Sequence, residues 1–109
     1  MKPELFLLFA LGVSSTSACA NYRFCHCYDS DGSPNNKATA TVCFWHAGPA
    51  YEGQLVYDIR EYGTGTMNQE CHATGRYDFN NCSWREDCQQ AGATGDDSSC
   101  WCKPLELCD

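Results

Sequence analysis

Apolar and polar residues alternate over four short stretches of the chain, with turn-forming residues between them. The stretches are Tyr22–Tyr28, Gln54–Ile59, Met67–Thr74 and Ser99–Lys103. A period of two places successive side chains on opposite faces of a strand, so each stretch predicts a β-strand. The glycine-rich segment Glu61–Thr66, between the second and third stretches, predicts a hairpin connection.

Two other stretches repeat apolar residues at the spacing of three or four that is typical of helices. The first is Asn35–Ala47, before which Ser33–Pro34 predicts an N-cap followed by proline in the first helical position. The second begins after Asp78 or Ser83, either of which is a suitable N-cap, and ends at Gly92. We therefore expect one helix between the first two strands and another between the last two.

The order strand, helix, strand, strand, helix, strand folds most simply as a split β-α-β arrangement when its crossovers are right-handed. This predicts an α+β fold, a disulfide-rich two-layer sandwich in which two helices cover one face of a four-stranded antiparallel sheet. No internal repeat or linker divides the chain. We expect a single domain over residues 19–109.

The N-terminal segment has the layout of a secretory signal peptide. One basic residue precedes the apolar run Leu5–Val13, and small residues follow it. The run is too short for a transmembrane helix, which needs about 20 apolar residues. Cleavage after Ala18 keeps Cys19 and an even number of cysteines, whereas cleavage after Ala20 leaves an odd one. We expect residues 1–18 to be removed and the protein to be secreted.

Composition supports the same compartment and excludes some partners. The chain has 109 residues, 10 of them cysteine, and a formal net charge of −7. Such a negative chain, without a lysine or arginine cluster, is not expected to bind nucleic acid or an anionic membrane surface. A small secreted domain of this cysteine content is typically held by disulfides. The ten cysteines are Cys19, Cys25, Cys27, Cys43, Cys71, Cys82, Cys88, Cys100, Cys102 and Cys108.

The predicted strand order suggests one disulfide. In a split β-α-β sandwich the first and last strands are antiparallel neighbours, so Cys19 and Cys108 would overhang the same edge of the sheet. We therefore predict a Cys19–Cys108 bridge that ties the chain ends together. The cysteines of the two Cys-x-Cys strands would then point toward the helices. Their predicted partners are Cys43, Cys82 and Cys88, with Cys71 taking up the remainder.

Two short motifs contain metal-ligand residue types. Cys25-His26-Cys27 holds zinc ligands, but zinc sites usually leave two or more residues between cysteines, and secretion favours disulfides. Asp29-x-Asp31 resembles the start of a calcium loop, but the later carboxylates of such a loop are missing. We interpret the first motif as a pair of bridging cysteines and the second as a turn. No metal or other cofactor is expected.

A secreted nuclease of this size would need two histidines, or one with a glutamate, and an arginine within hydrogen-bond reach of them. The candidates are His26, His46, His72, Glu52, Glu61, Glu70, Arg60 and Arg76. The three histidines fall on different elements, so nothing in the sequence predicts that they converge. We expect no catalytic residues and no enzymatic activity.

Asn81-Cys82-Ser83 is a formal N-glycosylation sequon, so Asn81 is a candidate acceptor, although it falls within a predicted helix. Three tryptophans, Trp45, Trp84 and Trp101, could form a surface that stacks on sugars. At helix and strand positions they are more often core residues, and we expect them to be core here.

The cysteine framework resembles that of small cysteine-rich proteins secreted by filamentous plant-pathogenic fungi. The segments that carry the resemblance are Cys25-x-Cys27, Asn35–Thr39 leading into Cys43, Phe79–Cys82 and Cys100-x-Cys102. Such proteins often have a doubled cysteine where this chain has Cys43-Phe44 and Cys82-Ser83. The expected order of elements is also similar to the smut-fungus killer-toxin fold.

The resemblance implies an effector or virulence-type protein that acts in the host apoplast, or after uptake, by binding rather than by catalysis. Its partner would be a host protein or a cell-wall glycan, and the protein would be a monomer. The alternatives are a killer-toxin-like antimicrobial protein and a small secreted ribonuclease.

Overall fold

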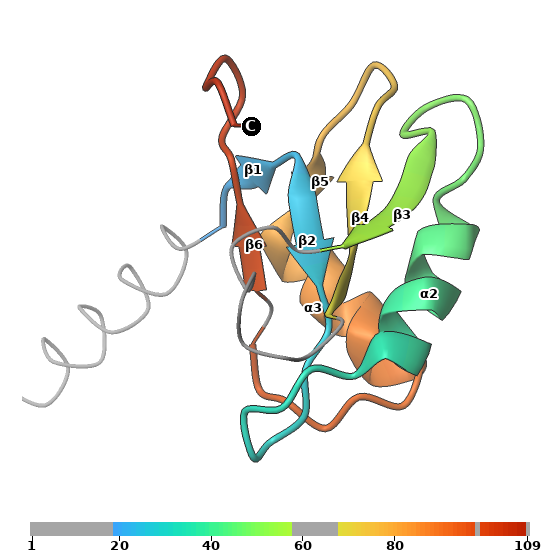
Figure 1. Cartoon of the computed structure of the whole chain (residues 1–109), viewed down its shortest axis with the longest axis vertical. Helices are drawn as coiled ribbons and strands as arrows, with labels where there is room; N and C mark the ends of the chain where they lie inside the picture. The colour runs from blue at the N-terminus through green and yellow to red at the C-terminus, as the bar shows by residue number, and fades with distance from the viewer. Residues whose placement is uncertain (1–18, 58–67, 98, 109) are drawn as a thin grey trace, which may run out of the picture.

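A computed structural model of the chain describes residues 19–57, 68–97 and 99–108. Within these ranges, strands precede, separate and follow two helices (Figure 1). The strands are β1 (Asn21–Tyr22), β2 (Phe24–His26), β3 (Gly53–Tyr57), β4 (Gln69–Ala73), β5 (Phe79–Asn80) and β6 (Ser99–Trp101). The helices are α2 (Asn36–Trp45) and α3 (Asn81–Gln90). The predicted signal peptide and hairpin connection lie outside the described residues.

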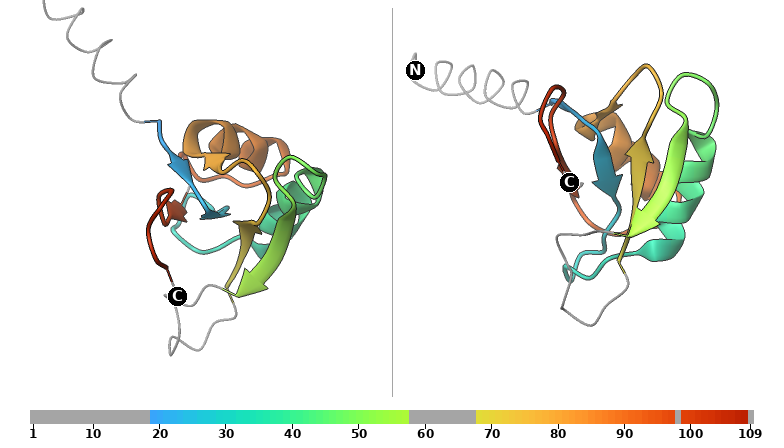
Figure 2. Two further views of the ribbon diagram at one scale, coloured as in Figure 1. Left: turned by 90° about the horizontal axis from the view of Figure 1, so that it is seen from above. Right: turned by 45° about the horizontal axis from the view of Figure 1, so that its top comes forward.

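The main sheet has the strand order β3-β4-β2-β6, and each neighbouring pair is antiparallel. In the middle of the sheet, Phe24 of β2 pairs with His72 of β4 on one side and with Trp101 of β6 on the other. Both helices lie on the same side of this sheet (Figure 2). The predicted α+β split β-α-β sandwich is therefore confirmed, and β2 and β6 are neighbours as expected.

The first predicted strand is divided in the structure. β1 leaves the main sheet and pairs antiparallel with β5, with Asn21 opposite Asn80. Arg23 lies between β1 and β2, where its N–H donates to Cys102 O at 2.8 Å and its carbonyl accepts from Ala73 N at 2.8 Å. The chain thus changes sheets at one residue, and its start is placed beside the start of α3.

Both helix starts differ from the prediction. Pro34 forms an isolated antiparallel bridge with Tyr28, so its backbone is extended and α2 begins only after Asn35. Asn35, not Ser33, is the N-cap, and its Oδ1 accepts from Ala38 N at 2.9 Å.

The second helix is capped by the last residue of β5 rather than by Asp78 or Ser83. Asn80 Oδ1 accepts from Cys82 N at 3.0 Å and from Ser83 N at 3.2 Å. β5, which pairs with β1, runs directly into α3. Asp78 therefore precedes the cap position, and Ser83 lies inside the first turn of the helix.

All ten cysteines are paired, and the predicted Cys19–Cys108 bridge is wrong. The pairs are Cys19–Cys82, Cys25–Cys100, Cys27–Cys88, Cys43–Cys71 and Cys102–Cys108. Because β1 pairs with β5, Cys19 lies beside Cys82 on α3. The chain beyond β6 turns back on itself, so Cys108 reaches Cys102 instead of the other chain end.

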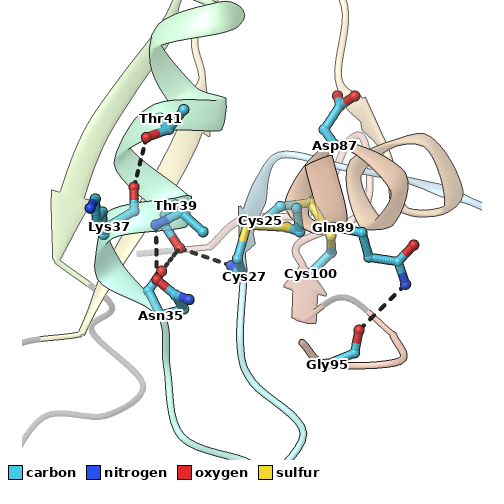
Figure 3. The surroundings of a disulfide bond; sticks show 12 residues. Cys25, Cys27, Asn35, Lys37, Thr39, Thr41, Asp87, Gln89, Gly95 and Cys100 are labelled. Atoms are coloured by element: carbon cyan, nitrogen blue, oxygen red, sulfur yellow. Dashed lines mark hydrogen bonds between the residues drawn. A yellow bond between two sulfur atoms is a disulfide. The ribbon is translucent and has the colours of Figure 1, made fainter. Parts of the chain in front are cut away.

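Of the four cysteines in the two Cys-x-Cys strands, only Cys27 bonds to a helix cysteine as expected. Cys25 and Cys100 face each other across β2 and β6 and bond to one another rather than to a helix (Figure 3). Two other bridges do join a helix to the sheet side, Cys27–Cys88 to α3 and Cys43–Cys71 to α2.

Sulfur makes up much of the core. Among the described residues, half of the buried apolar ones are cysteines, and Trp84, Phe79 and Val42 are the largest of the others. Thr39 is also buried, and its Oγ1 accepts a hydrogen bond from Cys27 N at 2.9 Å (Figure 3). With so few large aliphatic side chains, the bridges supply both covalent ties and packing volume.

Candidate functional site

The face of the main sheet opposite the helices carries a row of three stacked rings. Phe24 stacks on His72 with ring centroids 4.2 Å apart and on Trp101 at 4.7 Å, with the planes within 20° of parallel. The rings cover one another's faces across β4, β2 and β6. Since sugars and bases are bound by stacking on open ring faces, this row is a packed ladder rather than a stacking platform.

A carboxylate lies beside the ladder, on the same face of the sheet. Glu70 of β4 is 0% exposed, and its Oε1 accepts from Trp101 Nε1 at 2.8 Å. His26, on the neighbouring strand β2, is 8% exposed. His26, Glu70 and His72 thus share two adjacent strands of the main sheet, which the sequence did not predict. Substrate in solution has access to neither His26 nor Glu70 in this arrangement.

His72 is the member of this group with a perturbed pKa. Partial burial lowers the pKa of its imidazole below the usual 6.5; the positive charge of Arg23 lowers it further, and Asp78 opposes both. His72 is therefore held in its neutral form to lower pH than an exposed histidine.

The other nuclease candidates lie elsewhere. Glu52 and Arg76 line a broad surface hollow of about 560 Å³ beside Tyr77. His46 lies at the C-terminal end of α2. Arg60 and Glu61 fall outside the described residues. The structure therefore gathers three of the candidates on the main sheet, brings Glu52 and Arg76 together at the hollow, and leaves His46 apart from both groups.

Both carboxylates of the acidic turn at residues 29–33 accept hydrogen bonds from other groups of the protein. Asp29 Oδ1 accepts from Asn35 Nδ2 at 3.1 Å and from Thr94 N at 3.0 Å, and the bond to Thr94 N is the largest cause of its lowered pKa. Asp31 Oδ1 accepts from both the Oγ and the N of Ser33, and these bonds lower its pKa as well. These contacts are those of a turn, the preferred interpretation of this motif.

Asn81, the sequon residue, is the first residue of α3, and its Oδ1 accepts from Ala20 N at 2.7 Å. Its glycosylation stays a prediction.

The three tryptophans do not form one surface. Trp84 is buried in the core, Trp45 is exposed on α2, and Trp101 belongs to the ladder on the opposite side of the sheet. The core prediction therefore holds for Trp84 and fails for Trp45.

A small cavity opens between the end of α2 and the start of α3. Its volume is about 50 Å³. Its lining residues are His46, Tyr51, Phe79, Asn80, Ser83, Trp84 and Asp87. His46 Nε2 and Asp87 Oδ2 are 2.9 Å apart at the cavity and join the two helices. No pattern in the sequence indicates this pair, because its members are 41 positions apart.

The C-terminal segment forms a short covalent loop. The Cys102–Cys108 bridge closes it, and Glu106 N donates to Lys103 O at 3.1 Å across a tight turn. Leu105, at the third position of that turn, has a φ of 73°, where glycine is the usual residue. Leu105 and Leu107 are 99% and 98% exposed.

Two further bonds fix the loop. Lys103 N donates to Glu106 Oε1 at 2.9 Å, and Arg23 Nη2 donates to Glu106 O at 3.0 Å. Among the described residues, only one cluster of possible metal ligands has its side chains close enough together to share an ion. It consists of Cys102, Glu106 and Cys108. Both sulfurs are in the bridge, and a thiolate is what a metal would bind. The signal for this loop in the sequence is the Cys-x5-Cys spacing, which the predicted Cys19–Cys108 pairing obscured.

The fold and its bridges define the class, a small disulfide-rich α+β domain. Comparison with family models, with curated proteins and with solved structures gives no match. Within the described part of the chain, neither helix is long and apolar enough to cross a membrane.

Proposed function

We propose that the protein is a small secreted effector-type protein that acts by binding a partner rather than by catalysis. The observation that carries the proposal is the C-terminal loop. Two leucines are almost fully exposed on a segment that a disulfide, a turn and Arg23 hold in one conformation. Exposed apolar groups cost solubility, and a preordered loop loses little entropy on binding, so this combination is typical of a recognition element.

The chemistry of the loop favours a protein partner over a cell-wall glycan. Leucine side chains fit apolar pockets on proteins, whereas sugars are bound by open aromatic faces. The loop from Cys102 to Cys108 contains no aromatic residue. A host protein with an apolar pocket is therefore the partner that we propose, in the apoplast or after uptake.

Secretion is supported by the disulfides. Five bridges in a chain of 109 residues are typical of an oxidising compartment. The Cys19–Cys82 bridge also favours signal cleavage after Ala18, because a cut after Ala20 would remove Cys19 and leave Cys82 as a free thiol. The intact mass of secreted protein should rise by ten alkyl groups on reduction and alkylation. A native protein that already reacts with the alkylating reagent would contradict this start.

Binding is tested by quantitative capture from host apoplastic fluid and host cell extract on immobilised oxidised protein. The Leu105→Ser/Leu107→Ser variant should lose its specific partner. Leu55→Ser, which changes a partly exposed leucine on β3, is the matched control and should retain it. A partner that is captured equally by all three proteins, or by none of them, would contradict the proposal.

A ribonuclease is the second candidate, and His72 is the residue that would carry it, because it is the partly exposed member of the group that it forms with His26 and Glu70. RNA degradation by purified protein that is lost on His72→Ala would establish it. Equal RNA degradation by the wild type and His72→Ala would indicate a contaminant.

A killer-toxin-like role would instead be indicated by growth inhibition of rival microbes and by expression that does not depend on infection.

A further inference from the structure

Two loops lie side by side at one end of the main sheet (Figure 1). One joins α2 to β3 and covers residues 46–52, and the other joins β4 to β5 and covers residues 74–78. Gly75 N donates to Tyr51 O at 2.8 Å. A Cβ atom at Gly75 would lie only 2.8 Å from Ala50 O, so this close approach of the two backbones requires glycine. The two loops are therefore held together as one unit.

The hollow of about 560 Å³ lies on the surface of this unit. Its volume is within the range of roughly 300–1,000 Å³ that is usual for sites that bind small molecules. Its lining residues are Pro49, Ala50, Glu52, Thr74, Gly75, Arg76 and Tyr77. The lining thus combines apolar groups, one acid, one base and one aromatic ring.

Glu52 and Arg76 provide the charges of the hollow. Both residues are exposed, and within the described part of the chain neither side chain has an ion pair or a hydrogen bond. A ligand with a net charge would be attracted by one of them and repelled by the other. Hydroxyl groups suit both, because a carboxylate accepts hydrogen bonds and a guanidinium donates them.

The backbone of Glu52 has an unusual conformation. Its φ is 48°, in the left-handed region that favours glycine. Glu52 N donates to Gly48 O at 2.8 Å, and Glu52 O accepts from Thr74 Oγ1 at 2.8 Å, so both loops hold it in place. Such strain is concentrated at functional sites. Here it belongs to the residue that brings a carboxylate to the hollow.

Tyr77 adds an accessible aromatic ring. It is 53% exposed, and its ring neighbour is Tyr51, with centroids 6.1 Å apart and planes inclined by 56°. No ring of the described residues therefore stacks on Tyr77, whereas Phe24 has stacked neighbours at 4.2 and 4.7 Å. The C–H face of a pyranose ring is apolar and its rim is polar. It matches an open aromatic ring that is bordered by hydrogen-bonding side chains.

We propose that this hollow binds a neutral saccharide. The C–H face of one pyranose ring packs on Tyr77, its hydroxyls donate to the carboxylate of Glu52, and its oxygens accept from the guanidinium of Arg76. A metal ion would find a single carboxylate there, too few ligands for a specific site. The inference goes beyond the proposed function, because the hollow and the C-terminal loop are formed by different segments of the chain.

Neutral oligosaccharides test the site. Tetrasaccharides of glucose, of N-acetylglucosamine and of mannose are titrated separately into oxidised protein while its amide resonances are followed by NMR. At least one of them should bind with a Kd in roughly the millimolar range or below, as expected for a small ligand in an open site, and should shift resonances of residues 49–52 and 74–77. The tightest ligand identifies the source of the saccharide.

Charged probes are titrated in the same way. Glycine is a zwitterion that could use both charges of the hollow, and inorganic phosphate is an anion. Neither should shift the same resonances. Failure of all three saccharides to bind, or binding of glycine or phosphate in their place, would overturn the proposal.

Variants of Tyr77 assign the binding to the hollow. Tyr77→Ala should weaken saccharide binding about tenfold, whereas Tyr77→Phe should keep it within about twofold, because the ring supplies the contact. Tyr57→Ala is the matched control, since Tyr57 is 58% exposed on β3, outside the hollow, and its loss should leave binding unchanged. Each variant is checked for a native NMR spectrum. Full binding by Tyr77→Ala, or an equal loss in Tyr57→Ala, would overturn the site.

Two further variants test the carboxylate and separate the hollow from the C-terminal loop. Glu52→Gln should weaken binding about threefold or more, and Glu86→Gln, which changes an exposed glutamate on α3, should not. Unchanged binding by Glu52→Gln would overturn the part assigned to its carboxylate. Leu105→Ser/Leu107→Ser should bind saccharide as the wild type does, and a loss there would overturn the assignment to the hollow. Failure of every saccharide would leave the leucine-dependent capture of a host protein unaffected.

Discussion

The helix-covered side of the sheet and the C-terminal loop use the same covalent bond for different purposes. On the helix-covered side, Cys27–Cys88 and Cys43–Cys71 tie each helix to the sheet with sulfurs that are buried in the core. In the loop, Cys102–Cys108 closes a segment whose leucines contact solvent.

The difference shows how the number of residues between two cysteines decides what their bridge stabilises. Cys27 and Cys88 are 61 residues apart, and Cys102 and Cys108 are only 6 apart. A long-range bridge removes much freedom from the unfolded chain and holds the fold, whereas a short one mainly fixes local shape. We therefore interpret the first kind as structural and the second as a device that presents a binding surface.

Of the changes considered, complete reduction of the bridges should lower the stability of the protein most. Five bridges contribute about 10–20 kcal/mol, as much as the whole net stability of about 5–15 kcal/mol for a domain. Reduced protein should lose its cooperative thermal transition, as followed by circular dichroism. A reduced form that melts close to the oxidised one would contradict the structural role of the bridges.

Removing single bridges should separate the two regions. By the chain-entropy relation, Cys27→Ala/Cys88→Ala should lower the free energy of unfolding by about 4 kcal/mol, and more from the core cavity, whereas Cys102→Ala/Cys108→Ala should lower it by about 2 kcal/mol. Urea denaturation measures both. Equal losses would remove the distinction between the bridges.

Low pH should decrease the stability of the protein because of His72. Because burial lowers the pKa of His72 below 6.5, the unfolded chain takes up a proton first as pH falls through that value, and stability decreases. Above pH 6.5 both states are neutral and the histidine has no effect. His72→Gln should therefore flatten the dependence of the urea midpoint between pH 7.5 and 5.5. An unchanged slope would mean that His72 titrates equally in both states.

Changing the leucines should have the smallest effect on stability. Leu105 and Leu107 bury almost nothing, so Leu105→Ser/Leu107→Ser should alter the free energy of unfolding by no more than about 0.5 kcal/mol. The same urea experiment checks this. A loss of several kcal/mol would mean that the loop packs against the domain, and a loss of partner capture would then have a structural cause.

The fold was accessible from the sequence because its signals are local. Alternation located β3, β4 and β6, and helical spacing located α2 and α3. The helix caps were missed because Pro34 bridges Tyr28 and because β5 leads directly into α3. The first contact spans only the turn between Tyr28 and Pro34, whereas the second depends on the pairing of β5 with the distant strand β1.

The candidate sites were less accessible for the same reason. His46–Asp87 and the row of His26, Glu70 and His72 arise only when strands and helices are placed in space. The change of sheets at Arg23 redirects Cys19 toward Cys82, and no periodicity in the sequence marks it.

Disulfide mapping without reduction tests the contrast between the two regions most directly. Cleavage after Glu86 and Glu106 separates Cys82 from Cys88 and opens the C-terminal loop, and chymotrypsin then cuts at Trp101 between Cys100 and Cys102. The account predicts a fragment that joins Cys19 to Cys82 and another that joins Cys102 to Cys108. A fragment that joins Cys19 to Cys108 would contradict it, because the loop would then be part of the framework rather than a presented surface.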